Sequence, residues 1–200
     1  MYDVIIIGAR AAGSPTAMLL ARKGYRVLLL DRATFPSDTL STHQLQLPAS
    51  AMLKQWGLLD RVLATNPGAA HQICFDTGVV RFEGIFPSVD GINSVHSPRR
   101  IILDKILVDA AVEAGAELRE GFITEELVYE GKTVVGIRGR SSNGASITER
   151  ARFVIGADGR HSLVAKAVNA PHYNEHPVLT CGYYSYWQGV TPDGGEIYRR

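Results

Sequence analysis

The chain of 200 residues lacks several features that mark large classes of protein. No apolar run approaches the about 18 residues that a membrane-spanning helix needs. Lysine and arginine total 21 against 20 aspartate and glutamate residues, and the net charge of +1 gives no reason to expect a nucleic-acid partner. The first apolar run begins directly after Met1, which leaves no room for a signal peptide. We therefore expect a cytoplasmic protein.

Metal and redox motifs are also missing from the sequence. The two cysteines, Cys74 and Cys181, lie far apart without metal or redox spacing, which favours buried free thiols over a disulfide or a catalytic thiol. His172 and His176 are four residues apart, but prolines flank the pair and argue against a helical metal site. The sequence predicts no metal ion, and no side chain in it is required as a nucleophile.

The most informative feature that is present is the pattern of residues 1–32. A β-branched run at 4–7 predicts a buried strand, a glycine turn and a helix rich in small residues follow, and a second apolar run at 27–30 ends at Asp31. This order is typical of a dinucleotide-binding βαβ unit, in which the acidic residue falls about 20 residues after the glycine turn.

Each position in this unit has a physical reason. Gly8 allows a sharp turn at the end of the first strand, and Gly13 lets the helix pack close to the sheet. Free N–H groups and the dipole at the helix start favour a pyrophosphate. Pro15 fits the first helical turn, and the Asp31 carboxylate can accept hydrogen bonds from a ribose diol.

Arg10 breaks the glycine motif. The third residue of the motif is normally glycine, but the sequence here is Gly-Ala-Arg-Ala-Ala-Gly, with a long cationic side chain at that position. Two interpretations stay open. Either the Arg10 backbone adopts a compatible conformation and its guanidinium turns toward phosphate or solvent, or the site is damaged and binds its cofactor weakly.

The remainder of the chain has less distinctive patterns. Glycine and proline positions make 84–98 a predicted loop. We predict helices at 48–56 and 100–115, a hairpin of strands at 71–75 and 79–83, and strands at 116–119, 122–130, 133–140, 146–150 and 152–155. Strands of a different sheet are expected at 178–190 and 195–199, so that the chain stops on a strand. This favours the amino-terminal part of a longer protein or a naturally shortened relative.

Three separated motifs resemble the FAD-dependent monooxygenases of the aromatic-hydroxylase type, within the glutathione-reductase-like flavoproteins. The first runs from Gly8 to Asp31 and Arg32. The second is Arg100 followed by spaced leucines on a helix, and the third is the Asp-Gly motif at 154–162. The resemblance implies an α/β fold: a Rossmann-like FAD-binding βαβ domain with a small β-meander at 1–170, followed by the start of a second, substrate-binding β-sheet at 171–200.

The resemblance also implies cofactor contacts. Pyrophosphate contacts are expected from the glycine turn, at Gly8, Ala9, Arg10, Ala12 and Gly13. Adenosine contacts are expected from Asp31 to the ribose, from Arg32 beside the adenine, and from the backbone of Thr124. Arg100 would reach the FAD phosphate and ribityl region, since a guanidinium suits a diphosphate.

Two further regions complete the implied site. Asp158 and Gly159 would support the ribose and pyrophosphate, and in this family their motif is tied to NAD(P)H. The loop at 41–43, which contains Ser41, Thr42 and His43, would approach the flavin ring.

Simpler interpretations stand beside these roles. Arg100 could only cap or solubilise its helix, and Asp158 with Gly159 could form an ordinary turn. The alternating aromatic residues of 183–187 favour packing in a core or sheet over substrate stacking. Two departures from the family pattern matter: Ala165 and Lys166 stand where an arginine is usual, and the later Gly-Asp motif does not occur.

The function that the resemblance implies is NAD(P)H-dependent hydroxylation of a small aromatic or polyketide-like molecule through a flavin hydroperoxide. One alternative is a flavin reductase of the geranylgeranyl-reductase type. Flavin halogenases share the fold, but their Trp-x-Trp-x-Ile-Pro signature is absent. A further alternative is that the chain is a non-catalytic FAD-binding module, or half of a split protein that needs a carboxyl-terminal partner or a homo-oligomer.

Overall fold

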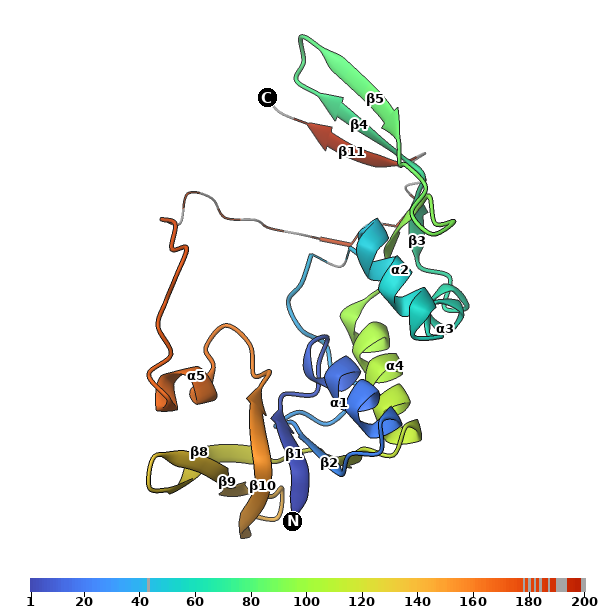
Figure 1. Ribbon diagram of the computed structural model, residues 1–200. Coiled ribbons are helices and arrows are strands. Elements are labelled where there is room, and N and C mark those ends of the chain that lie inside the picture. The colour runs from blue at the N-terminus through green and yellow to red at the C-terminus, as the bar shows by residue number, and fades with distance from the viewer. Residues whose placement is uncertain are drawn as a thin grey trace.

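The computed structural model describes residues 1–42, 44–177 and 194–198, together with residues 179, 181, 183, 185, 186, 188 and 189. Its largest sheet has six strands in the order β7-β2-β1-β10-β9-β8 (Figure 1). These strands are β7 (Glu117–Arg119), β2 (Val27–Leu30), β1 (Tyr2–Ile7), β10 (Ser146–Gly156), β9 (Thr133–Arg140) and β8 (Ile123–Glu130). Neighbours among β7, β2, β1 and β10 are parallel, whereas β10, β9 and β8 form an antiparallel meander.

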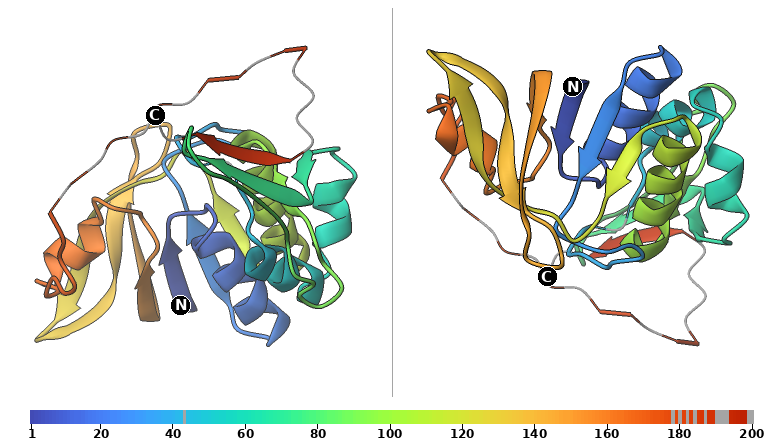
Figure 2. Two further views of the ribbon diagram at one scale, coloured as in Figure 1. Left: turned by 90° about the horizontal axis from the view of Figure 1, so that it is seen from above. Right: turned by 90° about the horizontal axis from the view of Figure 1, so that it is seen from below.

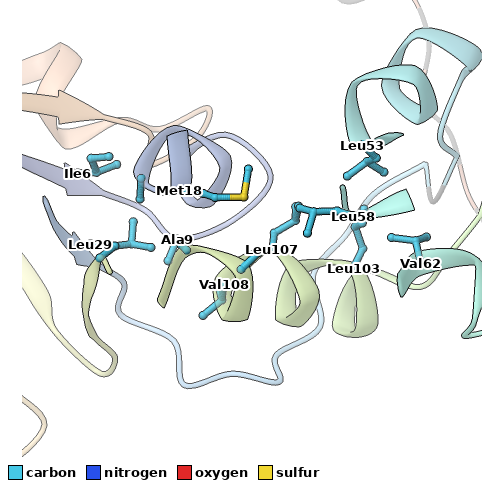
Figure 3. Packing of buried hydrophobic residues seen from close by; sticks show 14 of the residues in the cluster. Ile6, Ala9, Met18, Leu29, Leu53, Leu58, Val62, Leu103, Leu107 and Val108 are labelled. Carbon is cyan, nitrogen blue, oxygen red and sulfur yellow. The ribbon is translucent and has the colours of Figure 1, made fainter. Parts of the chain in front are cut away.

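Strands β1 and β2 are buried on both faces, which explains their continuous apolar runs. On one face, Ile6 and Leu29 pack in the core that helices α1 (Gly13–Arg22) and α4 (Arg100–Glu113) share (Figure 3). On the other face, Ile5 and Leu28 pack with Phe122, Leu127 and Ile137 of the meander region. Figure 2 shows the two helices and the meander on opposite sides of the parallel strands. The sheet therefore separates two apolar layers.

Two further helices extend the first layer. They are α2 (Leu47–Gln55), close to the predicted 48–56, and the short α3 (Leu59–Leu63). Leu53, Leu58 and Val62 continue the core beyond Leu103 of α4 (Figure 3). The sequence did not indicate α3, because five residues are too few for a helical periodicity to show.

Two small sheets lie apart from the six-stranded one. The hairpin of β4 (Gln72–Asp76) and β5 (Arg81–Ile85) pairs with β11 (Gly195–Tyr198) in the order β11-β4-β5 (Figure 1). β3 (Gly68–Ala70) and β6 (Val95–Ser97) form an antiparallel pair. The described part of the predicted strand at 195–199 is therefore a strand, and it adds to the hairpin in parallel.

Three expectations for the secondary structure need correction. The predicted loop 84–98 contains β6, whose pairing partner β3 is distant in sequence and leaves no local signal. The strands predicted at 146–150 and 152–155 are one strand, β10, which pairs with β9 through its first half and with β1 through its second. In 178–190 the described residues form no strand, and the others lie outside the described residues.

A last short helix, α5 (Leu163–Ala167), follows β10 and lies against the meander. Among the residues that the structure describes, no helix is long and apolar enough to cross a membrane.

Candidate cofactor site

The glycine turn after β1 requires glycine at both ends. Gly8 has a φ of 101°, and a Cβ there would overlap the carbonyl oxygen of Ala157. A Cβ on Gly13 would overlap the carbonyl oxygen of Gly8, so α1 packs directly against the turn. Both reasons that the sequence suggested, a left-handed turn and close packing, are present in the structure.

The start of α1 is open to an anion. Its N-cap is Ala12, which makes no side-chain capping bond, and the first turn contains no acidic residue. Ser14 uses its hydroxyl to donate to the carbonyl oxygen of Ala9 at 2.7 Å, which braces the turn. The uncapped N–H groups and the helix dipole therefore form a positive end at the carboxyl edge of β1.

Asp31 joins the glycine turn to the loop after β2. Its Oδ2 accepts from the backbone N–H of Ala9 at 2.7 Å, and its Oδ1 accepts from the N–H of Ala33 at 2.8 Å. The residue is only 9% exposed. Each carboxylate oxygen has a second lone pair, so a buried Asp31 can bridge the two loops and still accept from a hydroxyl.

The Arg10 side chain takes neither of the two orientations that the sequence left open. Its Nη1 donates to Asp104 Oδ2 at 2.7 Å and to the Ser37 carbonyl oxygen at 3.2 Å, and its Nη2 donates to Ser37 Oγ at 3.0 Å. Its guanidinium carbon lies 5.3 Å from the centre of the Phe35 ring. The expectation of a guanidinium turned toward phosphate or solvent is wrong, because a buried carboxylate of α4 holds it.

Arg100 converges on the same carboxylate. Its Nε donates to Asp104 Oδ1 at 2.9 Å and its Nη2 to Oδ2 at 3.0 Å, one helical turn along α4. Asp104 is fully buried, whereas the Arg10 and Arg100 side chains are 26% and 16% exposed. Two partly exposed cations and one buried anion give this three-residue cluster one net positive charge. The sequence analysis missed Asp104, although an acidic residue on an apolar helix face is a recognisable signal.

Asp158 lies where β10 ends, beside the glycine turn. Its Oδ1 accepts from the Ser162 hydroxyl at 2.6 Å, and its Oδ2 accepts from the backbone N–H of Leu163 at 2.6 Å. Ser162 is itself the N-cap of α5. The carboxylate therefore fixes the start of α5, as the simpler turn interpretation implied, while the Ala157 carbonyl before it contacts Gly8.

The chain before Thr124 lies against the residues that follow β2. The N–H of Phe122 donates to the Asp31 carbonyl oxygen at 2.9 Å, and that of Gly121 donates to the Ala33 carbonyl oxygen at 3.1 Å. The Thr124 hydroxyl oxygen is buried without a hydrogen-bond partner. The entry to β8 is thus brought against the residues that follow β2, although about ninety residues separate them in sequence.

Comparison with known proteins matches this geometry to a family. Residues 1–191 match the family described as FAD binding domain. The chain belongs to the FAD binding domain family. Both the resemblance to flavoprotein monooxygenases and the predicted α/β fold are thereby confirmed.

Individual members of the family differ in their reactions. Aklavinone 12-hydroxylase DnrF of Streptomyces peucetius is 31% identical over 184 residues, which cover 83% of this chain and 37% of that protein. The probable electron transfer flavoprotein-quinone oxidoreductase YgcN of Escherichia coli is 33% identical over 166 residues, covering 82% and 37%. The myxobacterial chondrochloren halogenase CndH superposes with a TM-score of 0.71 at 26% identity, covering 80% and 38%. The chain thus spans less than two-fifths of the length of these relatives.

Other predicted residues of the FAD binding domain lie at its surface. Arg32 and Thr42 are exposed, Ser41 and Gly159 flank the crevice loops, and His43 lies outside the described residues. Among the aromatic residues of 183–187, Tyr183 and Tyr186 are exposed, which contradicts core packing, and the Tyr186 ring lies 4.9 Å from the Arg99 guanidinium. No strand forms there among the described residues, so no sheet face is available to cover these rings. Tyr184 and Trp187 lie outside the described residues.

The described cysteines and histidines of the FAD binding domain form no metal-binding group. Cys74 is a buried free thiol as predicted, but Cys181 is exposed. His172 contacts Glu175 at 3.1 Å on the surface. Within the described ranges, no three His, Cys, Asp or Glu side chains are grouped so that they could hold a metal ion.

Among the groups with shifted pKa values, Arg99 lies at the start of α4, where its hydrogen bond to Asp38 raises its pKa. Burial and a hydrogen bond to Glu117 raise the pKa of Tyr2 to about 12. Burial, and next the nearby His71, lower the pKa of His96 on β6.

Proposed function

We propose that the crevice between the glycine turn, the end of β2 and the start of α4 binds FAD, and that the protein is an FAD-dependent oxidoreductase. The observation that supports this proposal best is the tight glycine turn at the open start of α1, where a Cβ on Gly8 or Gly13 would overlap backbone carbonyl oxygens. This cradle, together with the Asp31 carboxylate, fits a dinucleotide with a ribose and a diphosphate.

Different residues of the proposed site would contact different parts of the cofactor. Gly8 and Ala9 would lie against the pyrophosphate, although their own N–H groups already donate within the protein, to Leu30 and Asp31. The N–H groups of Ala12 and Gly13 at the start of α1 would donate to it. Arg100 has N–H groups beyond the two that bond Asp104, and these suit a phosphate oxygen.

The adenosine half has its own set of contacts. Asp31 would accept the ribose hydroxyls with the lone pairs that Ala9 and Ala33 leave over. Arg32 and the backbone of Thr124 would border the adenine, because Phe122 brings the entry of β8 against Asp31.

Fewer of these residues would contact the flavin ring than the pyrophosphate or the adenosine. Thr42 would approach the ring from the loop after β2. Asp158 and Gly159 would border the ribityl side, with Asp158 acting chiefly by fixing the start of α5.

The reaction that we propose is NAD(P)H-dependent monooxygenation of a small organic molecule, with an aromatic or polyketide-like compound as the candidate class. FAD would supply the electron transfer and the activation of oxygen, while the residues described here would bind and orient it. We further propose residues 1–170 as the FAD-binding domain and 171–200 as the beginning of the substrate domain. The pairing of β11 with β4 joins these two segments in one small sheet. The name of the Streptomyces relative, a hydroxylase, supports this class.

The test of FAD binding is the visible absorption spectrum of the purified chain before and after addition of FAD, followed by gel filtration. A flavin spectrum that travels with the protein is expected. A colourless protein that ignores added FAD would contradict binding by these residues. Substitution Asp31→Ala should weaken retention, because it removes the ribose acceptor and both bridging bonds.

A second candidate is a flavin oxidoreductase that does not use oxygen, such as a reductase of the geranylgeranyl-reductase type. The observation in its favour is the Escherichia coli relative, whose name describes an electron-transfer flavoprotein-quinone oxidoreductase. Anaerobic turnover of an organic substrate by a protein that contains this chain would select the reductase, whereas a strict need for oxygen would select the monooxygenase.

A further inference from the structure

Arg10 links three segments that converge on the crevice. Its backbone belongs to the glycine turn, its guanidinium donates to Ser37 in the loop after β2, and it pairs with Asp104 of α4. The Phe35 ring, which is only 7% exposed, lies against the same guanidinium. One side chain thus makes contacts that the motif's usual glycine could not make.

The anchor of this link is the Asp104 carboxylate. It is fully buried, and both of its oxygens accept from guanidinium groups, with Arg10 on Oδ2 and Arg100 on both oxygens. A buried carboxylate is stable only when it is paired and hydrogen-bonded, so Asp104 constrains both arginines. Because both arginines bind this one carboxylate, it also fixes the distance between their guanidinium groups.

The loop at 33–39 depends on these contacts for its position. Its other fixed points include the Ala33 N–H, bound to Asp31, and the Phe35 N–H, which donates to Glu120 Oε1 at 2.9 Å. The Asp38 carboxylate also accepts from Arg99 Nη2 at 2.7 Å. Ser37 is held by Arg10 through both its carbonyl and its hydroxyl. An ordered loop lowers the entropy lost when a ligand binds against it.

We propose that Asp104 and Arg10 are positioning residues for the cofactor crevice: Asp104 holds the Arg10 guanidinium on the loop at 35–37 and sets the distance of Arg100 from the glycine turn. Arg10 then stabilises the crevice through the loop and does not act as a ligand of the phosphate. This inference rests on the proposed FAD binding for its effect on affinity, but its effect on the loop is independent of FAD.

The decisive variant is Arg10→Gly, which restores the glycine that the dinucleotide motif usually has. If position 10 merely tolerated arginine, this substitution would strengthen FAD binding. We expect the reverse, a rise in the Kd for FAD of about tenfold, which is the size of effect typical for one coupled ion-pair network. Arg10→Lys should fall between, because it keeps the charge and loses the planar fork.

Asp104→Asn tests the anchor, and Asp109→Asn is its matched control. Asp109 also pairs with a cation at i,i+4 spacing on α4, Lys105, but its side chain is 38% exposed. We expect Asp104→Asn to raise the Kd for FAD about tenfold or to prevent folding, and Asp109→Asn to change it less than about twofold. If Asp104→Asn does not fold, Arg10→Gly carries the test alone.

The double variant Arg10→Gly with Asp104→Asn distinguishes positioning from general destabilisation. If the two residues act through one link, the double variant loses about as much affinity as the worse single variant. Fold-changes that multiply would overturn the proposal, as would an unchanged or lower Kd in Arg10→Gly.

Hydrogen exchange of the FAD-free chain separates this inference from the proposed function. In Arg10→Gly we expect the amides of 35–39 to exchange about tenfold faster than in the unsubstituted chain, with β1 unchanged. Exchange within about twofold would overturn the positioning role. A chain that never retains FAD but shows the faster exchange would overturn the proposed function and leave the positioning of the loop established.

Discussion

Strands β1 and β5 both contain large apolar side chains, yet these side chains lie in different surroundings. In β1, Ile5 and Ile6 are completely buried, because helices cover one face and the meander region covers the other. In β5, Phe82 and Ile85 are 62% and 82% exposed. The difference lies in the layers around each sheet, since backbone pairing is present in both.

The two regions are therefore held together by different forces. The six-stranded sheet has two apolar layers, and burial of apolar surface is the main stabilising contribution to a fold. The three-stranded sheet β11-β4-β5 depends mostly on its hydrogen-bonded ladder, which by itself gives marginal stability in water. The proposed cofactor site lies at the edge of the first region, where β1 and β2 end.

The largest predicted effect comes from glycines in the two regions. Gly13→Ala should cost more than about 4 kcal/mol and prevent cooperative folding, because its Cβ would overlap the Gly8 carbonyl and neither backbone can move alone. Gly84→Ala in β5 is the matched control, since a Cβ there meets no atom within 4 Å. Urea denaturation followed by circular dichroism measures both variants.

A folded Gly13→Ala chain of near-normal stability would mean that α1 can move away from the turn. It would remove the main physical argument for the tight cradle beside Gly8. A large loss in Gly84→Ala would instead show that the small sheet is covered more than its exposure indicates.

Isoleucines provide the next contrast. Ile6→Ala should destabilise the chain by about 3 kcal/mol, because it leaves a cavity between the sheet and the helices. Ile85→Ala should change stability by less than about 0.5 kcal/mol, because the side chain is already in contact with solvent. Equal losses in the same denaturation experiment would disprove the difference between the regions.

The third comparison concerns two carboxylates that accept hydrogen bonds in turns, and the expected differences in stability are smaller. Asp158→Ala should cost about 1 kcal/mol in the FAD-free chain, because the Ser162 hydroxyl and the Leu163 N–H lose their acceptor at the start of α5. Asp76 accepts only from Gly78 in the exposed hairpin, and Asp76→Ala should stay within about 0.5 kcal/mol. Thermal unfolding measures both variants. A larger loss of stability in Asp76→Ala than in Asp158→Ala would contradict this prediction.

The sequence predicted the first region well because its signals are local. The strand, turn and helix around Gly8 and Gly13 follow from neighbouring residues, as does the acidic end of β2 at Asp31. The direction of the Arg10 side chain could not follow in this way, because Asp104 lies 94 residues further on. Only the fold brings the two together.

The small sheets were harder to predict for the same reason. β3 and β6 are three residues each, and each becomes a strand only through the other. β10 was split in the prediction because it changes partner midway, from β9 to β1. A strand that is defined by distant pairing has little period of its own, so hydropathy alone does not reveal it.

His96 gives the smallest predicted effect and tests where the boundary between the regions lies. It belongs to the two-stranded sheet, yet it is only 7% exposed, and its Nε2 lies 3.3 Å from the Ser94 hydroxyl. Burial first, and His71 second, lower its pKa below the ordinary 6.5 in the folded chain. The unfolded chain therefore binds the proton more readily than the folded one.

The stability that comes from neutral His96 is accordingly present above pH 6.5 and is lost as the pH falls through the lower pKa of the folded state. We expect the urea midpoint to decline between about pH 7 and pH 5, and His96→Gln to decline less steeply over the same interval. Carboxylates titrate in both proteins, so the difference between the two slopes isolates the histidine. Identical slopes would mean that His96 is as accessible to solvent as the apolar side chains of β5, and the boundary of the buried region would then lie before β6.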